Sequence, residues 1–558
     1  MKKIVVLALS LAICSLSQAE DIVVRYKGVT AKVETKLKDS VNVTVDGANV
    51  NIESLYQAHK LTLRLTGKSD DGALNLKTAG KAQVKLDGLT LTSQEGAPLC
   101  LKNKKKVEIT APKGTKNTLT ITACVDTANH KAAVIWAKDK LLFSGKGTLD
   151  VIATGDGCRG IKSKDDITIE DLTLNVTTTG DNLGEKPFGF GDFQMPDFGE
   201  GFPGFGGDSI MGGGFPGFGG GFPGFGNDST MRGNFPDFSQ FPGLGNDSIM
   251  RRGFPNDSTM RRSFPGFGGG FPNDSTMRGN FPDFSQFPGF GGGFTGFGND
   301  STMMGGFPGF DGEMPDFGGG GFGGKHKYVA SAKGIASKGK IIVNSGNVTV
   351  RTSTAGAEGI EGKQGIDFNG GNVDVLVPDD AINANDVITF NGAHVLAIST
   401  GNDAVDANPK NGFFMPFGSN NDQNVEPTII ITGGTVYAWS QVGSPEEGLD
   451  SDFSPLAISG GTLFTVGGGM GEMPSVPTND TARQPTALLI GLQVDKDEPI
   501  QVCDASGKLL DTVTIPFSLR RNATLLSSPS FTLGSTYTVK TKSQTRTFTL
   551  NEAFTTVR

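Results

Sequence analysis

The sequence has 558 residues, including 82 glycines and 39 phenylalanines, and its formal net charge at pH 7 is −8. This charge, and the absence of a concentrated basic stripe along the sequence, predict that nucleic acid is not a partner. After the N-terminal segment no apolar run is long enough to span a membrane, and no stretch repeats with a helical period. An all-β protein is therefore the expected class.

Residues 1–19 have the pattern of a signal peptide. Met1-Lys2-Lys3 is positively charged, residues 4–13 are mostly apolar, and Ser17-Gln18-Ala19 ends in a small residue. This order predicts cleavage after Ala19 and export of the mature chain. We expect the protein in the periplasm, at the cell surface or secreted.

Four cysteines remain after cleavage. An exported chain can form disulfides, but the spacing of these cysteines matches neither a disulfide framework nor a zinc site. We therefore expect them to be small apolar side chains within strands: Cys100, Cys124, Cys158 and Cys503.

Residues 20–182 have the patterns of short β-strands. Residues 166–169 and 172–176 predict two strands that follow a corner at Gly160–Lys164. β-Branched residues favour strands, and Gly and Asn tolerate the positive φ that a sharp corner requires. This segment is predicted to be the N-terminal part of a parallel β-helix.

The strand pattern stops between residues 183 and 324, where Gly, Phe and Pro recur throughout. Gly and Pro at this density cannot sustain helices or sheets, so this segment is predicted to be a disordered insert. When the pattern resumes, Leu172 and Leu174 correspond to Val348 and Val350. The fold is therefore expected to close without the insert.

A triplet of Asp, Ser and a third residue, Ile or Thr, repeats within the insert. It resembles an O-glycosylation sequon used in one phylum of Gram-negative bacteria. Its copies in an exported, exposed tract predict glycosylation at Ser209, Ser229, Ser248, Ser258, Ser275 and Ser301.

Residues 325–482 contain a repeat whose apolar anchors step from 335 to 360 (25), to 382 (22) and to 405 (23). A fixed period of this size indicates a solenoid, in which each unit buries its apolar face against its neighbours. Two strands and a corner per repeat, with no room for a crossover helix, predict a parallel β-helix. Aligning the second strands by their glycine turns predicts two inward columns: Val348, Val373, Val395, Val436 and Leu463, and Val350, Val375, Ala397, Ala438 and Thr465.

The alternate positions of these strands point outward, and they become apolar along the chain. Tyr437 and Trp439 lie in this row with Leu396, Ile398, Phe464 and Val466. An exposed apolar row is rarely left bare. The favoured prediction is that strands of the C-terminal β segment, 483–558, cover it, and the alternative is a platform on which sugar rings stack.

Carboxylates and amides crowd the repeating corner. Equivalent residues of successive turns lie about 4.8 Å apart in a β-helix, and like charges at that spacing repel unless a cation lies between them. Ca²⁺ takes six to eight oxygen ligands, which these side chains could supply. The alternative is that Asp and Asn bond to their own backbone in Asx-turns.

The corners with the pattern Asp-(Gly/Ala)-(Ile/Val)-x-(Ala/Ser)-(Asn/Lys), and the turns that follow them, resemble a family of exported bacterial carbohydrate-binding-domain proteins. Asp87–Leu91 and Lys116–Leu119 also fit this family. The resemblance covers most of residues 22–558 outside the insert. It implies a right-handed parallel β-helix related to polysaccharide lyases, bound calcium, and affinity for cellulose or pectic polymers.

Carried over residue by residue, the resemblance implies the calcium ligands Asp379, Asp380, Asp403 and Asp406, with Glu358, Glu361 and Asp450 as secondary candidates. The sequence departs from the family pattern at Glu358 and Glu361, and the corner at Lys333–Ile335 has no acid.

The predicted function is non-catalytic binding of a plant cell-wall or acidic (pectic) polysaccharide, with calcium as a possible requirement. One alternative is a polysaccharide lyase acting on uronates, in which Lys363 or Lys338 would be the base. Another is a surface adhesin or structural rod. The oligomeric state is not predictable from the sequence.

Overall fold

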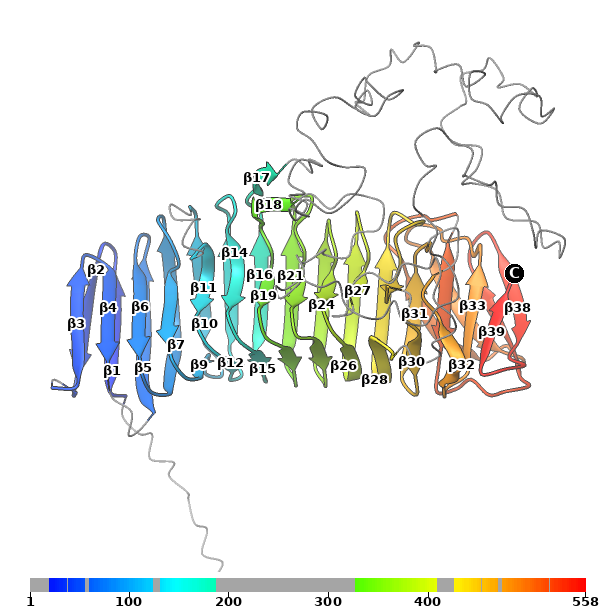
Figure 1. Cartoon of the computed structure of the whole chain (residues 1–558), viewed down its shortest axis with the longest axis horizontal. Helices are drawn as coiled ribbons and strands as arrows, with labels where there is room; N and C mark the ends of the chain where they lie inside the picture. Colours follow the sequence, from blue (N-terminus) through cyan, green and yellow to red (C-terminus); the bar gives the residue numbers. More distant parts are fainter. Residues whose placement is uncertain are drawn as a thin grey trace, which may run out of the picture. The chain divides into compact units, whose positions relative to one another are not determined.

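The computed structural model describes residues 20–37, 39–55, 60–123, 131–186, 327–408, 426–452, 454–469, 474–520 and 522–558. Within these ranges every regular element is a β-strand (Figure 1), so the predicted all-β class is confirmed. Among the same residues no helix offers the length and apolar character needed to cross a membrane. All of them belong to one compact unit of the chain.

Most of the described strands form two sheets, here called the first sheet, with 22 strands, and the second sheet, with 11. The strands of the second sheet are β3 (Val41–Asp46), β4 (Asn49–Ser54), β6 (Ala73–Thr78), β8 (Leu99–Asn103), β11 (Ala133–Ala137), β14 (Arg159–Ser163), β19 (Ile335–Ser337), β22 (Ile360–Gly362), β25 (Ile382–Ala384), β27 (Val405–Ala407) and β29 (Leu449–Asp450).

The first sheet contains β1 (Ile22–Lys27), β2 (Thr30–Thr35), β5 (Leu61–Ser69), β7 (Ala82–Ser93), β9 (Val107–Thr110), β10 (Lys116–Ile121), β12 (Leu141–Ser144), β13 (Thr148–Ala153), β15 (Ile167–Ile169), β16 (Thr173–Thr178), β20 (Ile341–Val343), β21 (Asn347–Thr352), β23 (Ile366–Phe368), β24 (Asn372–Val377), β26 (Ile388–Ser399), β28 (Ile429–Ser440), β30 (Leu456–Ile458), β31 (Thr462–Val466), β32 (Pro477–Ala482), β33 (Thr486–Ile490), β36 (Ala523–Ser527) and β39 (Phe554–Val557).

The chain runs through these sheets in repeating turns. One turn contributes β14 to the second sheet and then β15 and β16 to the first, and the next turn contributes β19, β20 and β21 in the same order. Each strand pairs in parallel with its counterpart in the next turn: β14 with β19, β15 with β20, and β16 with β21. Apolar side chains from both sheets fill a continuous core between them.

Most turns contain three strands, whereas the sequence predicted two strands and a corner; β26 and β28 each take both positions of the first sheet in their turns. The predicted corners form the short strands β19, β22, β25 and β27 of the second sheet. Each is only three residues long, which is too short for an alternating pattern to be recognised. Their Gly, Ala, Ser and Asn residues also have low strand propensity, so the parallel ladder, and not local preference, holds them extended.

The predicted inward columns are confirmed. Val348 pairs with Val373, Val373 with Val395, Val395 with Val436, and Val436 with Leu463. The column that begins at Val350 continues in the same way. The glycine turns explain why the alignment succeeded. At Gly371, for example, φ is +82°, and a Cβ would lie 2.5 Å from the carbonyl oxygen of Gly346.

The register predicted across the insert is wrong by two residues. Leu174 pairs with Val348 and Val176 pairs with Val350. β16 nevertheless pairs directly with β21. Strands β17 (Leu183–Lys186) and β18 (Lys327–Ala330), which lie on either side of residues 187–326 in the sequence, pair antiparallel with each other. Residues 183–186 of the predicted disordered insert form β17, which corrects the predicted start of the insert, and residues 187–324 lie outside the described residues. The predicted signal peptide and all six predicted glycosylation serines also lie outside them.

The C-terminal residues form two structures. β33, β36 and β39 join the first sheet at its C-terminal end. A four-stranded antiparallel sheet, here called the covering sheet, consists of β34 (Pro499–Asp504), β35 (Leu509–Thr514), β37 (Thr536–Lys540) and β38 (Thr545–Thr549). Its apolar side chains, such as Val502 and Val539, form one buried cluster with Ile398, Trp439 and Phe464 of the first sheet.

The cysteines correct the prediction at one position. Cys158 is disulfide-bonded, whereas Cys100 and Cys503 are buried free thiols, as expected of apolar side chains within strands. Cys124 lies outside the described residues.

Candidate metal centre on the second sheet

The middle residue of each short strand of the second sheet points away from the core. In β22, β25 and β27 these residues are Glu361, Asn383 and Asp406, and they pair in sequence from one turn to the next. Asp450 of β29 continues the column. This outer column therefore becomes acidic toward the C-terminal turns.

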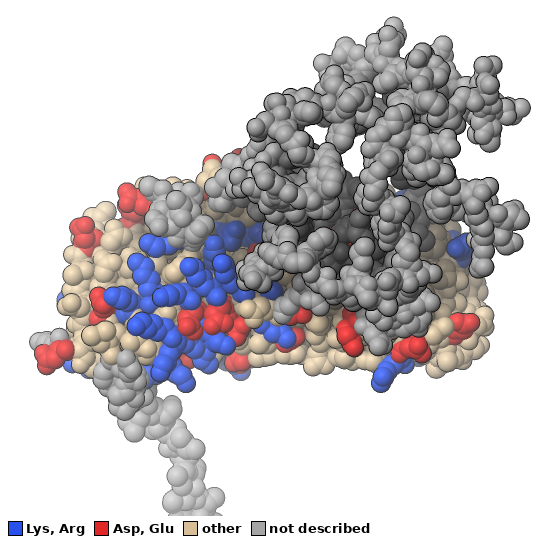
Figure 2. Space-filling model, viewed as in Figure 1, with Lys and Arg blue, Asp and Glu red and all other residues tan. Residues whose placement is uncertain are grey.

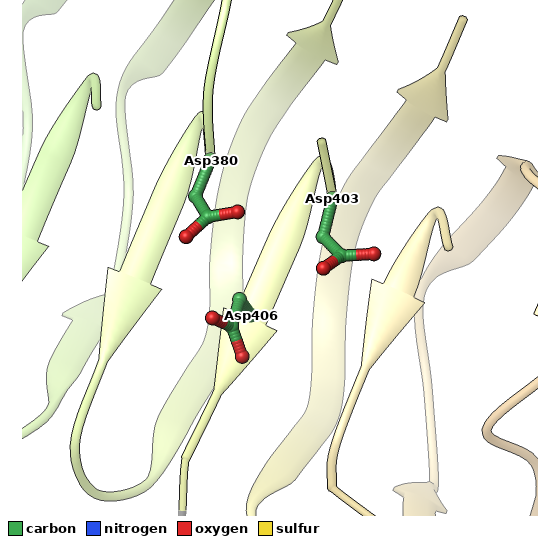
Figure 3. Close-up of side chains that lie close together, drawn as sticks. All are labelled: Asp380, Asp403 and Asp406. Atoms are coloured by element: carbon green, nitrogen blue, oxygen red, sulfur yellow. The ribbon is translucent and has the colours of Figure 1, made fainter. Parts of the chain in front are cut away.

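Three aspartates converge at this position. Asp380 and Asp403 precede β25 and β27, and Asp406 lies within β27 (Figure 3). One carboxylate oxygen of each lies within 4.8 Å of the others, and all three side chains are buried. We call these residues the aspartate cluster.

The hydrogen bonds of the cluster lie both within a turn and between neighbouring turns. The Nδ2 of Asn383 donates to Asp380 Oδ2 at 2.8 Å and to Asp406 Oδ2 at 3.1 Å. The N–H of Glu447 donates to Asp403 Oδ1 at 2.5 Å. These contacts differ from the local bonds of an Asx-turn, which Asp450 does make by accepting from the N–H of Asp452 at 2.9 Å. The Asx-turn alternative therefore describes Asp450 better than it describes the cluster.

The electrostatics of the cluster oppose its own ionisation. Burial raises the pKa of Asp403 well above its ordinary value, and the neighbouring carboxylates of Asp450, Asp380 and Asp406 raise it further. Burial, with Asp450, likewise raises the pKa of Glu447 well above its ordinary value. A cation would remove this repulsion. Because the three ligand atoms are carboxylate oxygens, without nitrogen or sulfur, the set fits Ca²⁺ better than Zn²⁺.

We expect an Asp403→Asn variant to become more stable relative to the wild type as pH rises in the presence of chelator. A raised folded-state pKa gives stability that is fully present below the unfolded pKa and is lost as pH rises through the folded pKa. Asn mimics the protonated form and escapes this loss. As pH rises above the ordinary carboxyl pKa, the difference in the free energy of unfolding should change by up to about 1.4 kcal/mol per pH unit. Urea unfolding at several pH values measures it, and a pH-independent difference would contradict the expectation.

The structure separates the other predicted ligands from the cluster. Asp379 lies next to Asp380 in the chain, but its Oδ1 accepts from Asn402 Nδ2 at 2.9 Å. Glu358 and Glu361 contact Lys333, whose Nζ lies 2.8 Å and 2.7 Å from their carboxylate oxygens. In that turn a lysine ammonium occupies the position between carboxylates that a metal ion would take. The sequence showed Lys333 at a corner without an acid, but not that its side chain reaches the next turn.

Tyr437 and Trp439 lie under the covering sheet. Trp439 is 4% exposed, and its ring stacks on Tyr437 with centroids 6.0 Å apart. The Tyr437 hydroxyl donates to the Asp511 carboxylate at 3.1 Å. A sugar-stacking platform requires exposed rings, so this arrangement matches the favoured prediction of a covered apolar row.

The chain is an all-β protein built from stacked parallel turns, and its second sheet carries an acidic cluster. The chain belongs to the family of carbohydrate-binding domain-containing proteins. The family model matches residues 46–186 and 323–490, which together make up more than half of the sequence. The matched segments include the aspartate cluster and leave out most of the Gly/Phe/Pro-rich insert.

One solved structure that the chain matches is that of a polysaccharide lyase-like protein from C. thermocellum, determined as a gadolinium derivative. The two chains share 13% sequence identity, and the match covers 67% of this chain and 90% of the solved one, with a TM-score of 0.35. A likeness at that level carries no functional argument. Comparison with curated proteins gives no match.

Proposed function

We propose that this protein binds an acidic polysaccharide without cleaving it, and that Ca²⁺ held by the aspartate cluster takes part in binding. The observation that carries the proposal is the convergence of Asp380, Asp403 and Asp406 on the outer face of the second sheet, in a member of a carbohydrate-binding family. We further propose that the stacked turns form a right-handed parallel β-helix and that the chain is exported.

The chain's own residues define what such a site could do. The three aspartates would supply the charged ligands, and Asn383 orients Asp380 and Asp406 by donating to both. Calcium would supply a positive charge with coordination positions open to further oxygen ligands. The carboxylates of a uronate polymer are oxygen ligands of this kind.

Calcium is expected to raise the melting temperature of the wild type by binding only the folded state. At a calcium concentration about 100 times the Kd, this adds about 2.7 kcal/mol to the free energy of unfolding. The double variant Asp380→Asn with Asp403→Asn should lose the effect. Asp379→Asn is the matched control, because Asp379 lies beside the cluster but outside it.

The measurement is calorimetry with calcium and with chelator, combined with glycan-array binding under both conditions. Equal melting of the wild type with calcium and with chelator would exclude the metal. Array binding that persists in chelator would leave a carbohydrate-binding protein without calcium dependence.

One observation favours the second candidate, a lyase. Burial, with the positive charges of Arg159 and Lys338, lowers the pKa of Lys162 to about 8, as a catalytic base requires. However, Lys162 lies four strands from Asp406, through Ala336, Glu361 and Asn383. At about 4.8 Å per strand this is about 19 Å, too far for base and cation to act on one sugar.

Lys363, which the sequence suggested as a base, is also poorly placed to accept a proton from a substrate. Lys363 Nζ contacts Glu361 at 2.8 Å and Asn385 Oδ1 at 3.0 Å, so its ammonium is held by acceptors. Incubation with polygalacturonate and ultraviolet detection of unsaturated products distinguishes the two functions. We expect no absorbance increase, and an increase that Lys162→Gln abolishes would establish a lyase.

A further inference from the structure

Six lysines form one column on the outer face of the second sheet. They occupy consecutive turns, two residues beyond the column that leads to the aspartate cluster. Each lies 25 or more positions from the next in the sequence, so only the fold brings them together. We call them the lysine column: Lys77, Lys102, Lys138, Lys164, Lys338 and Lys363.

The strand register fixes this column. Lys77 pairs with Lys102. In the following turns each lysine comes directly after a paired residue, and its N–H donates to the turn before it. Lys138 donates to Leu101, Lys164 to Ala137, Lys338 to Ser163 and Lys363 to Ser337. The neighbouring lysines therefore lie about 4.8 Å apart along the sheet, measured between strands.

The lysines at the two ends of the column form ion pairs with glutamates, but within the part of the chain that the structure describes the four lysines between them do not. Lys77 contacts Glu53 at 2.6 Å, and Lys363 contacts Glu361 at 2.8 Å. The four lysines between them are exposed and have no ion pair within the described residues: Lys102, Lys138, Lys164 and Lys338. Like charges facing each other on adjacent strands are unfavourable unless an anion lies between them.

Two further observations concern the positive charge of the turns that carry the lysine column. Figure 2 shows Lys and Arg side chains gathered over the N-terminal half of the stacked turns. Lys162, in the adjacent column, has a pKa lowered to about 8 by burial and then by neighbouring cations that include Lys338 and Lys164. The fold therefore assembles a basic column from lysines that the sequence keeps far apart.

We propose that the lysine column binds an acidic polysaccharide that lies across the strands, with its carboxylates between successive lysines. This inference rests on the proposed function and adds the surface of the protein that recognises the charge of the ligand. A linear uronate polymer carries one carboxylate per sugar ring, and the length of a ring is similar to the spacing between strands. The column also leads toward the turns that carry the aspartate cluster.

Two observations favour this ligand over other polymers. Neutral glycans and single-stranded nucleic acids are commonly held by exposed aromatic rings. The exposed large apolar side chains of the described residues are Val and Leu, and Trp136, beneath the column, is buried. Recognition on this face must therefore depend on charge, and a single straight row of lysines fits a single extended chain.

The test compares two variants with the same change in charge. The first replaces Lys102, Lys138, Lys164 and Lys338 by Gln. The control replaces four other exposed lysines that lie outside the column and have no ion pair within the described residues: Lys27, Lys36, Lys508 and Lys540. All eight side chains are exposed, so both variants should fold, and circular dichroism melting confirms this.

Binding is measured by calorimetry in the presence of calcium with three probes: polygalacturonate, the same polymer fully methyl-esterified, and duplex DNA. We expect the wild type to bind polygalacturonate, and the column variant to bind it about tenfold or more weakly, since four exposed ion pairs are lost. The control variant should bind as the wild type does. The column variant should also show a flatter dependence of affinity on salt.

Each other result overturns the inference in a different way. Equal polygalacturonate binding by the column variant and the wild type would exclude the lysine column but leave the proposed function standing. Equal binding of the esterified polymer would show that charge is not recognised. Tighter binding of DNA at the same salt would assign the column to nucleic acid. If the wild type binds none of the polysaccharides, the proposed function fails as well.

Discussion

Replacing Lys333 by methionine is expected to destabilise the fold by about 3–5 kcal/mol, because it removes the cation of the largely buried Glu358 and leaves the buried Glu361 with Lys363 alone. The Lys333 ammonium lies between Glu358 and Glu361, and only 9% of the residue is exposed. Burial acts to lower the pKa of Lys333, but the two carboxylates outweigh it and raise that pKa above its ordinary value. The lysine is thus charged and holds the two glutamates in place.

The glutamates respond differently to the same lysine. Burial opposes ionisation of Glu361, yet Lys333 and Lys363 together lower its pKa. For Glu358 burial is the largest influence, and its pKa is raised. A pKa that folding lowers gives stability that is lost as pH falls, so the contribution of Glu361 should be lost only in strong acid.

Urea unfolding near neutral pH measures the effect of Lys333→Met. The matched control is Lys340→Met, which removes a lysine of the same turn whose ion pair with Asp367, at 2.7 Å, is more exposed. Exposed pairs contribute about 0–1 kcal/mol, so the control should change little. A loss of stability in Lys333→Met no larger than in the control would show that the buried network is not needed. Partial rescue of Lys333→Met by calcium would show that a metal ion can replace the ammonium.

The long strands were predictable because their chemistry is local. Val348 and Val373 alternate with polar residues, and a glycine stands two positions before each of them. Period two and a positive-φ turn are sufficient to align such strands without knowledge of the fold. The alignment failed by two residues only across the insert, where Leu172, Leu174 and Val176 offer three apolar positions at the same spacing.

The candidate site was predictable only in part. The acidic corners of Asp380, Asp403 and Asp406 are visible in the sequence, and the structure brings these three together. Asp379 is an aspartate of the same corner, but its side chain accepts a hydrogen bond from Asn402 and does not join the cluster. The pairing of Lys333 with Glu358 and Glu361 depends on the spacing between turns, which the sequence does not reveal.

The lysine column is a clearer example of contacts between turns that the sequence does not reveal. In the sequence its members are separated by 25 or more residues, and none stands in a basic run except near Lys102. Net charge and local composition therefore do not reveal the charge of this surface. Stacked turns convert one residue type per repeat into a continuous stripe, so the charge of a solenoid must be counted by column.

Trp439→Ala is expected to destabilise the C-terminal end of the fold by about 3–5 kcal/mol while leaving glycan affinity unchanged. Trp439 belongs to the buried cluster between the first sheet and the covering sheet, with Ile398, Phe464 and Val502. Its Nε1 has no hydrogen-bond partner among the described residues, so packing alone holds the ring. Removing it leaves a cavity beneath the covering sheet, which should open more readily.

The measurement pairs calorimetric melting with polygalacturonate binding well below the melting temperature. Trp439→Phe is the control, because it retains most of the apolar contact and should cost clearly less than Trp439→Ala. The proposed ligand surfaces lie on the second sheet, whereas Trp439 lies on the outer face of the first sheet under the covering sheet. Binding should therefore survive in the fraction of protein that remains folded. Loss of binding with unchanged melting would show that Trp439 is an exposed sugar-stacking residue, and the covering sheet would then have to move to admit the ligand.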